Sequence, residues 1–163
     1  MNNIRDNIWL ENKMYDLWEE YFNDIPRQNL VVIRFGKRSA RQLGSIKWAN
    51  ASTTGVKKVI ARLERQHGEK LSEIFEDPRV SVITITRLYQ DENIPEYVVD
   101  STISHEMIHY AHGFSSPLKQ LYAHPHKGGL IRKEMLARGM GDVWRNAKKW
   151  LKQNWGEHIS SML

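Results

Sequence analysis

Two histidines and a glutamate have the types and the spacing of a metal-dependent hydrolytic site. They lie in the stretch HEMIH, which is an HExxH motif at residues 105–109. Residues four apart lie on the same face of a helix, so the imidazoles of His105 and His109 can bind one metal ion. The carboxylate of Glu106 lies beside the first ligand, where it can act as general base on a zinc-bound water. The motif therefore predicts a zinc site that hydrolyses peptide bonds.

A zinc site of this kind needs a third protein ligand, which must be His, Asp or Glu because the chain has no cysteine. The metzincin pattern HExxHxxGxxH is excluded, since His112 and Ser115 stand where that pattern has its Gly and its last His. A glutamate ligand would have to be Glu134, which has no supporting pattern around it. His124 and His126, in the stretch AHPHKGG, are better placed. We expect one of these two histidines to be the third ligand.

The segments around the motif predict the elements that position it. Helices are expected where apolar residues recur at three- and four-residue steps, over residues 6–23, within 55–78 (one or two helices), and over 98–113, 130–138 and about 142–155. Strands are expected over residues 29–36, 43–50 and 79–89, with a basic hairpin connection between the first two. The predicted class is α+β: a small antiparallel or mixed sheet of about three strands, with helices packed on one side, including the helix that carries HExxH.

Length and composition predict one domain over residues 1–163, because the chain is 40% hydrophobic and 26% charged. The N-terminal segment lacks the apolar run of a secretion signal, and no stretch is long enough to cross a bilayer. We therefore expect a cytoplasmic protein without a membrane partner. The 24 Lys and Arg residues exceed the 19 Asp and Glu residues, which favours polyanions such as nucleic acid as partners.

Basic side chains line one face of the last predicted helix, at about residues 142–155. They are Arg145, Lys148, Lys149 and Lys152. A Trp-rich apolar stripe on the same helix predicts that it packs on the core and leaves the basic face in solvent. That face is also a candidate DNA-contact surface, because lysines bind phosphates without reading base sequence.

The order of these segments resembles the SprT-like zinc metallopeptidases, the family that includes the Spartan DNA-protein crosslink proteases. The matching stretches are YDLWEEYFNDI (15–25), LGSIKWAN (43–50), VITITRLY (82–89), SHEMIHYAHG (104–113) and HKGGLIRKEM (126–135). The resemblance spans about residues 10 to 138, and HEMIH followed by a spaced histidine is its most specific part.

The resemblance implies a zincin-like fold and a zinc endopeptidase with one Zn²⁺ per chain, acting on protein substrates that include DNA-associated proteins, in the cytoplasm or at the nucleoid. The positions that match the family's zinc ligands are His105, His109 and His126, and its general base falls on Glu106. His126 is favoured because Leu130 stands where the family has an aromatic residue. His124 stays the alternative, since Lys127 separates His126 from the glycine that directly follows the family's histidine.

Two other interpretations stay open. The protein is either a zinc-containing DNA-binding or structural module without turnover, or a basic globular domain in which HExxH is accidental. His112 is expected to lie outside the metal's ligand set. Candidates to stabilise the oxyanion of a tetrahedral intermediate are Tyr110, Tyr122, His124 and Arg132.

Overall fold

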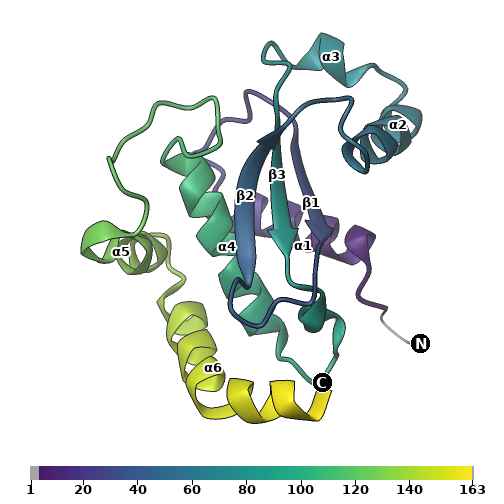
Figure 1. Ribbon diagram of the computed structural model, residues 1–163. Coiled ribbons are helices and arrows are strands. Elements are labelled where there is room, and N and C mark those ends of the chain that lie inside the picture. The colour runs from purple at the N-terminus through teal and green to yellow at the C-terminus, as the bar shows by residue number, and fades with distance from the viewer. Residues whose placement is uncertain (1–3, 163) are drawn as a thin grey trace.

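Three strands form a central sheet, and helices surround it (Figure 1). The computed structural model describes residues 4–162. The helices are α1 (Asn7–Tyr21), α2 (Val56–His67), α3 (Leu71–Ile74), α4 (Glu96–Ala111), α5 (Leu130–Ala137) and α6 (Gly141–Met162). The strands are β1 (Val31–Phe35), β2 (Gly44–Ala49) and β3 (Val80–Ile85), and short 3₁₀ helices span η1 (Arg87–Gln90) and η2 (Lys127–Gly129). The predicted α+β class is confirmed, with a mixed sheet.

The strands lie in the order β1, β3, β2, so the predicted hairpin between the first two strands is wrong. β1 pairs parallel with β3, and β2 pairs antiparallel with β3. The connection between β1 and β2 crosses the end of β3 instead of turning tightly. There the Gly36 N–H donates to the Ile85 carbonyl at 2.9 Å, and the Thr86 N–H donates to the Leu43 carbonyl at 2.9 Å. β3 is apolar on both faces, which suits a strand with a neighbour on each side.

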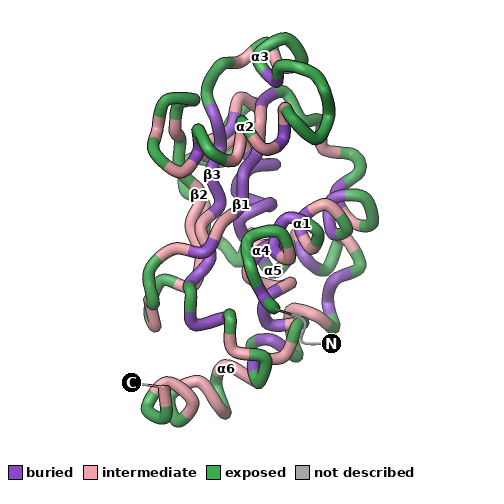
Figure 2. The backbone as a smooth tube through the Cα atoms, turned by 90° about the vertical axis from the view of Figure 1, so that its right-hand side faces the viewer, coloured by how far each residue is buried: buried purple, intermediate pink, exposed green. Residues whose placement is uncertain are grey.

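Helices cover both faces of the sheet, so the prediction that they pack on one side is wrong. On the inner face, Ile33 and Ile83 belong to the main core with α1, α4, α5 and α6. On the outer face, Val32 and Val82 pack with Val56 of α2 in a smaller cluster. Successive strand residues point to opposite faces, and both sets are apolar here, so each face needs its own cover. Figure 2 shows buried residues concentrated along β1, β3 and α4.

Local sequence signals set the ends of the helices. Asp6 caps α1, its side chain accepting the Trp9 N–H at 2.9 Å. Gly68, in the left-handed conformation, ends α2, so the predicted helical region contains two helices. α6 continues to Met162, beyond its predicted end near residue 155. Within residues 4–162, no helix combines the length and the apolar character that crossing a membrane requires.

Arg138 joins the end of α5 to the end of α1. Its guanidinium donates to the Tyr21 carbonyl at 2.8 Å and to the Asp24 carboxylate at 2.6 Å, and it also pairs with Glu134 at 3.1 Å. The bond from Arg138 lowers the pKa of Asp24 from its ordinary value. This arrangement anchors α5, the helix that follows the His126 loop, on the core.

Candidate metal centre

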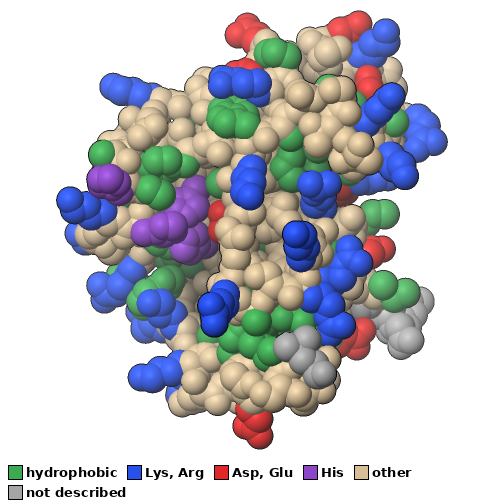
Figure 3. Space-filling model, viewed as in Figure 1, with side chains coloured by type: hydrophobic (Ala, Val, Ile, Leu, Met, Phe, Trp, Pro, Cys, Tyr) green, Lys and Arg blue, Asp and Glu red, His purple; other side chains and the backbone are tan. Residues whose placement is uncertain are grey.

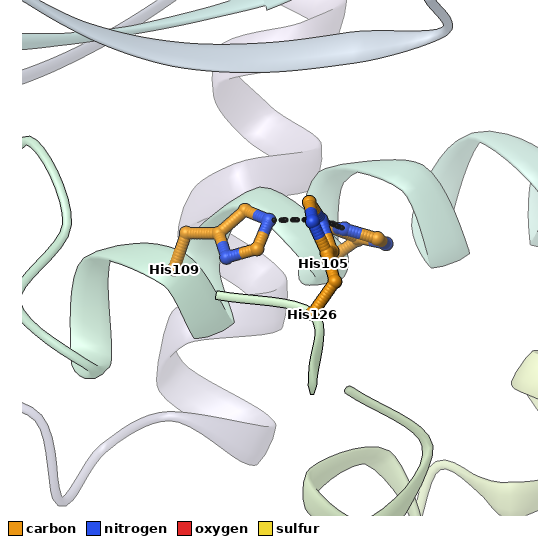
Figure 4. Close-up of side chains that lie close together, drawn as sticks. All are labelled: His105, His109 and His126. Carbon is orange, nitrogen blue, oxygen red and sulfur yellow. Dashed lines mark hydrogen bonds between the residues drawn. The ribbon is translucent and has the colours of Figure 1, made fainter. Parts of the chain in front are cut away.

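Three imidazole rings meet beside α4 (Figure 4). His105 and His109 lie one turn apart on α4, and His126 lies at the end of the loop that precedes η2. The Nε2 atom of His126 is 3.1 Å from Nε2 of His105 and 3.0 Å from Nε2 of His109. Among residues 4–162, these three histidines form the one group of metal-binding side chains whose donor atoms lie within 4.8 Å of one another.

The two distances from the His126 nitrogen fit one zinc ion. Zn–N bonds of about 2.0–2.1 Å in tetrahedral geometry place two ligand nitrogens about 3.3 Å apart. Burial, and secondarily the neighbouring cations, lowers the pKa of His105 to about 4. Burial likewise lowers the pKa of His109 to about 3. Both rings are therefore neutral near pH 7 and offer the lone pair that a metal ion requires.

Glu106 belongs to α4, and its side chain lies between that helix and the edge strand β2. Its side chain is 5% exposed, and burial raises its pKa to about 8. Gly44 of β2 passes directly over it: a Cβ atom at position 44 would lie 3.0 Å from Oε1 of Glu106 and 2.9 Å from Cγ2 of Thr102. The glycine therefore lets the strand approach the carboxylate closely.

The loop between α4 and η2 is held by specific contacts that bring His126 to the site. The chain reverses at Gly113, whose φ is +85°, and a Cβ atom there would lie 2.5 Å from the Lys119 carbonyl oxygen. The Ser81 hydroxyl of β3 donates to the Ser115 carbonyl at 2.6 Å. The Leu121 N–H also donates to the His112 carbonyl at 3.0 Å, so the first half of the loop closes on itself and is tied to the sheet.

Two predicted alternatives lie outside the three-histidine group. His124 is exposed and does not belong to it. Glu134 points its carboxylate to Nε2 of His112 at 3.4 Å and to Arg138. His112 itself is buried and also lies outside the group, as expected. Of the candidate third ligands, the structure therefore brings His126 to His105 and His109.

None of the four candidates for oxyanion stabilisation lines the cleft that contains the histidines. The Tyr110 hydroxyl donates to the Asn29 side chain at 2.7 Å inside the core. The Tyr122 ring lies against His112, with 4.8 Å between ring centroids. Arg132 lies over the Trp144 ring at 5.6 Å, and His124 is exposed. These side chains have structural or solvent contacts instead.

The cleft has a volume of about 560 Å³ and lies between β2, α4, the His126 loop and α6. Its larger apolar side chains are those of Leu43, Ile46, Phe114, Ile131, Trp144 and Leu151. Two cations, Arg41 and Lys148, also line it. β2 is an edge strand, and its residues 44–46 border the cleft directly.

The basic residues predicted on α6 divide between three environments. Lys148 lines the cleft and lies over the Trp144 ring at 4.8 Å. Arg145 pairs with Asp142 at 2.6 Å. Lys149 and Lys152 are exposed and do not line the cleft.

Sequence reasoning missed the part that Gly44 plays at the site. The signal was present, since a glycine inside a strand pattern marks a close approach of the backbone to another group. The cleft position of Lys148 had no such signal, because it depends on how α6 crosses α4.

Comparisons with models of known protein families, with curated proteins and with solved structures found no match to this chain.

Proposed function

We propose that this protein is a zinc-dependent endopeptidase of the zincin-like kind. His105, His109 and His126 are the zinc ligands, and Glu106 is the general base. The observation that carries the proposal is that Nε2 of His126 lies 3.1 Å from Nε2 of His105 and 3.0 Å from Nε2 of His109, beside the buried carboxylate of Glu106. The resemblance of the sequence to SprT-like metallopeptidases supports the same assignment.

The peptide substrate is proposed to bind along the free edge of β2. An extended peptide can add to a sheet edge through backbone hydrogen bonds, with its alternate side chains facing pockets. Residues 44–46 of β2 border the cleft next to Glu106. The apolar lining favours apolar substrate side chains, and the cations Arg41 and Lys148 favour acidic ones. Binding there would bring a peptide carbonyl next to the three histidines.

A zinc ion held by the three histidines would polarise the peptide carbonyl, lower the pKa of a water molecule and favour the ionised carboxylate of Glu106. Glu106 accepts the proton of the attacking water and then donates it to the leaving amine. The close contact with Gly44 fixes the carboxylate and keeps bulk water away from it. By the resemblance to Spartan-type proteases, we propose DNA-associated proteins as substrates.

Metal analysis, a cleavage assay and three substitutions test this function. Purified protein is expected to contain close to one zinc per chain. His126→Ala should lose this zinc, whereas the matched control His124→Ala should keep it. Glu106→Gln should retain zinc and lose casein cleavage by at least about 100-fold, because general acid–base catalysis contributes 10²–10⁴-fold.

Two outcomes would contradict the proposal in different ways. A stable wild-type protein without zinc would remove every zinc-based function. Stoichiometric zinc without cleavage of casein or histones would favour a zinc-containing module without turnover. Running the cleavage assay with and without DNA asks whether substrates bound to DNA are preferred.

A further inference from the structure

Half of the outer face of the sheet has no helix over it. α2 covers the half that carries Val32, Val80 and Val82. On the other half, Arg34 of β1, Thr84 of β3 and Ser45 of β2 lie side by side in register, and Lys47 lies on the same face of β2. An uncovered sheet face made of polar and charged residues is built to meet water or a polar partner.

This uncovered half forms the floor of a concave surface of about 920 Å³, which we name the basic groove. Five cationic side chains line it: Arg34, Lys37, Arg38, Lys47 and Arg87. No acidic side chain lines it, and none of the five cations forms an ion pair with a residue of the described chain. The formal net charge of the whole chain is +5. The five cations of this one surface therefore equal in number the excess of Lys and Arg over Asp and Glu in the entire chain.

Hydrogen bonds hold the walls of the basic groove in place. Arg87 donates to the Gly36 carbonyl at 3.2 Å, which fastens the loop after β1 to η1. The Thr86 hydroxyl donates to the Ser39 carbonyl of the same loop at 2.6 Å. Lys37, Arg38 and Lys47 remain exposed. The cations therefore stand on a fixed frame and can meet an external anion.

We propose that the basic groove binds the sugar–phosphate backbone of a nucleic acid. Phosphates spaced along a strand match five cations spread over a concave surface, and each contact releases counterions. The serine and threonine side chains on the floor are also common partners of phosphate oxygens. No aromatic side chain other than the buried Phe35 lines the groove, so it offers no surface for base stacking. Binding is therefore independent of base sequence.

The same composition argues against a membrane or a protein as the occupant. A membrane-binding surface needs exposed apolar side chains beside its cations, and a protein interface needs apolar or aromatic anchors. The single apolar side chain lining the basic groove is that of Phe35, which is buried.

The basic groove lies beside the proposed active site. Gln42, Gly44 and Ser45 line both the groove and the cleft that holds the three histidines. Figure 3 shows Lys and Arg side chains spread over the face that also carries the histidines. A nucleic acid in the groove would thus run along the β2 side of the cleft. The proposal rests on the charge and shape of this surface and stands without the proposed protease activity.

The test compares two double substitutions that remove the same charge from different surfaces. Lys37→Gln/Lys47→Gln changes the basic groove, and Lys149→Gln/Lys152→Gln changes the outer side of α6. All four lysines are exposed, so the fold is expected to stay intact. Binding of short mixed-sequence DNA oligonucleotides, single-stranded and duplex, is measured by fluorescence anisotropy between about 50 and 200 mM salt.

The groove variant is expected to bind oligonucleotides at least about tenfold more weakly at the lower salt concentration. Its slope of log affinity against log salt should be shallower by about 1.4 for single strands and about 1.8 for duplex, from two lost phosphate contacts. The α6 variant tests the DNA-contact face that the sequence suggested on α6, and it should bind within about twofold of wild type, because two exposed charges away from the groove act only weakly through screening solvent. Glu106→Gln should bind like wild type, which separates this result from the cleavage assay.

Three results would overturn the proposal. The first is an equal loss of oligonucleotide affinity in both double variants. The second is that the wild type binds neither oligonucleotide at low salt. The third is a groove variant that loses binding to anionic phosphatidylserine vesicles but keeps its affinity for DNA.

Discussion

Gly44 determines how closely the sheet approaches the proposed general base. Any side chain at this position would begin 3.0 Å from the carboxylate of Glu106 and 2.9 Å from Thr102. Both neighbours stand on α4, a packed helix that cannot retreat without disturbing the core behind it. The position therefore controls where the carboxylate points.

We predict that Gly44→Ala lowers kcat/KM for peptide cleavage by at least about tenfold, because a shift of about 1 Å in a catalytic group costs up to 10²-fold. Zinc content should stay at the wild-type level, since the ligands lie on other residues. Peptide kinetics and metal analysis check this. Lys47→Ala is the control, because its side chain lies on the opposite face of β2 and does not line the cleft. Wild-type kinetics in Gly44→Ala would show that the contact is unimportant.

The sequence allowed part of the candidate metal centre to be predicted, for a local reason. His105, Glu106 and His109 belong to one helix, so their spacing alone places them together. His124 and His126 lie two residues apart in one loop, and the choice between them depends on the loop's path. That path is set by the reversal at Gly113 and by the tie to the sheet, neither of which leaves a pattern in the sequence.

At the scale of elements, the helices and strands were predicted well, but their pairing was not. Periodicity reports where a segment forms a helix or a strand, and the three strands and α1, α2 and α4 lie within the predicted segments or within a few residues of them. It does not report the neighbour of a strand. Short basic connections commonly join hairpins, yet this one crosses β3, because β3 is the strand with apolar residues on both faces.

We predict that Arg138→Ala destabilises the fold by about 2 kcal/mol, because it removes hydrogen bonds to charged partners and leaves the Tyr21 carbonyl without its donor. Arg132→Ala, at an exposed position within α5, should change stability by less than about 0.5 kcal/mol. Urea unfolding followed by circular dichroism measures both values. Equal effects of the two substitutions would show that the link between α5 and α1 contributes nothing specific.

Across the whole molecule, the proposed zinc site joins segments that are far apart in the chain. α4 supplies two histidines, and the loop before α5 supplies the third. A ligand that binds only the folded chain stabilises it by mass action, by about 4 kcal/mol at a concentration 1,000 times its Kd. The metal would therefore contribute to the stability of the fold as well as to its chemistry.

We predict that removing zinc with a chelator lowers the melting temperature of the wild type by roughly 10 °C, given about 2–4 °C per kcal/mol for a domain of this size. His126→Ala should already melt at the lower temperature and should not respond to the chelator. His124→Ala should respond like the wild type. Differential scanning fluorimetry provides the measurement, and an identical chelator response in His126→Ala would exclude that histidine as a ligand.

The position of β3 between β1 and β2 also constrains how the chain can be made in the cell. As the polypeptide leaves the ribosome, β1 and β2 emerge first, and neither has a partner in the sheet until residues 80–85 follow. Their unpaired edges are the kind of surface that aggregates in nascent chains. The three histidines can come together only after residue 126 has emerged. Capture of the proposed zinc ion would therefore be one of the last events of biosynthesis, after the three strands have paired.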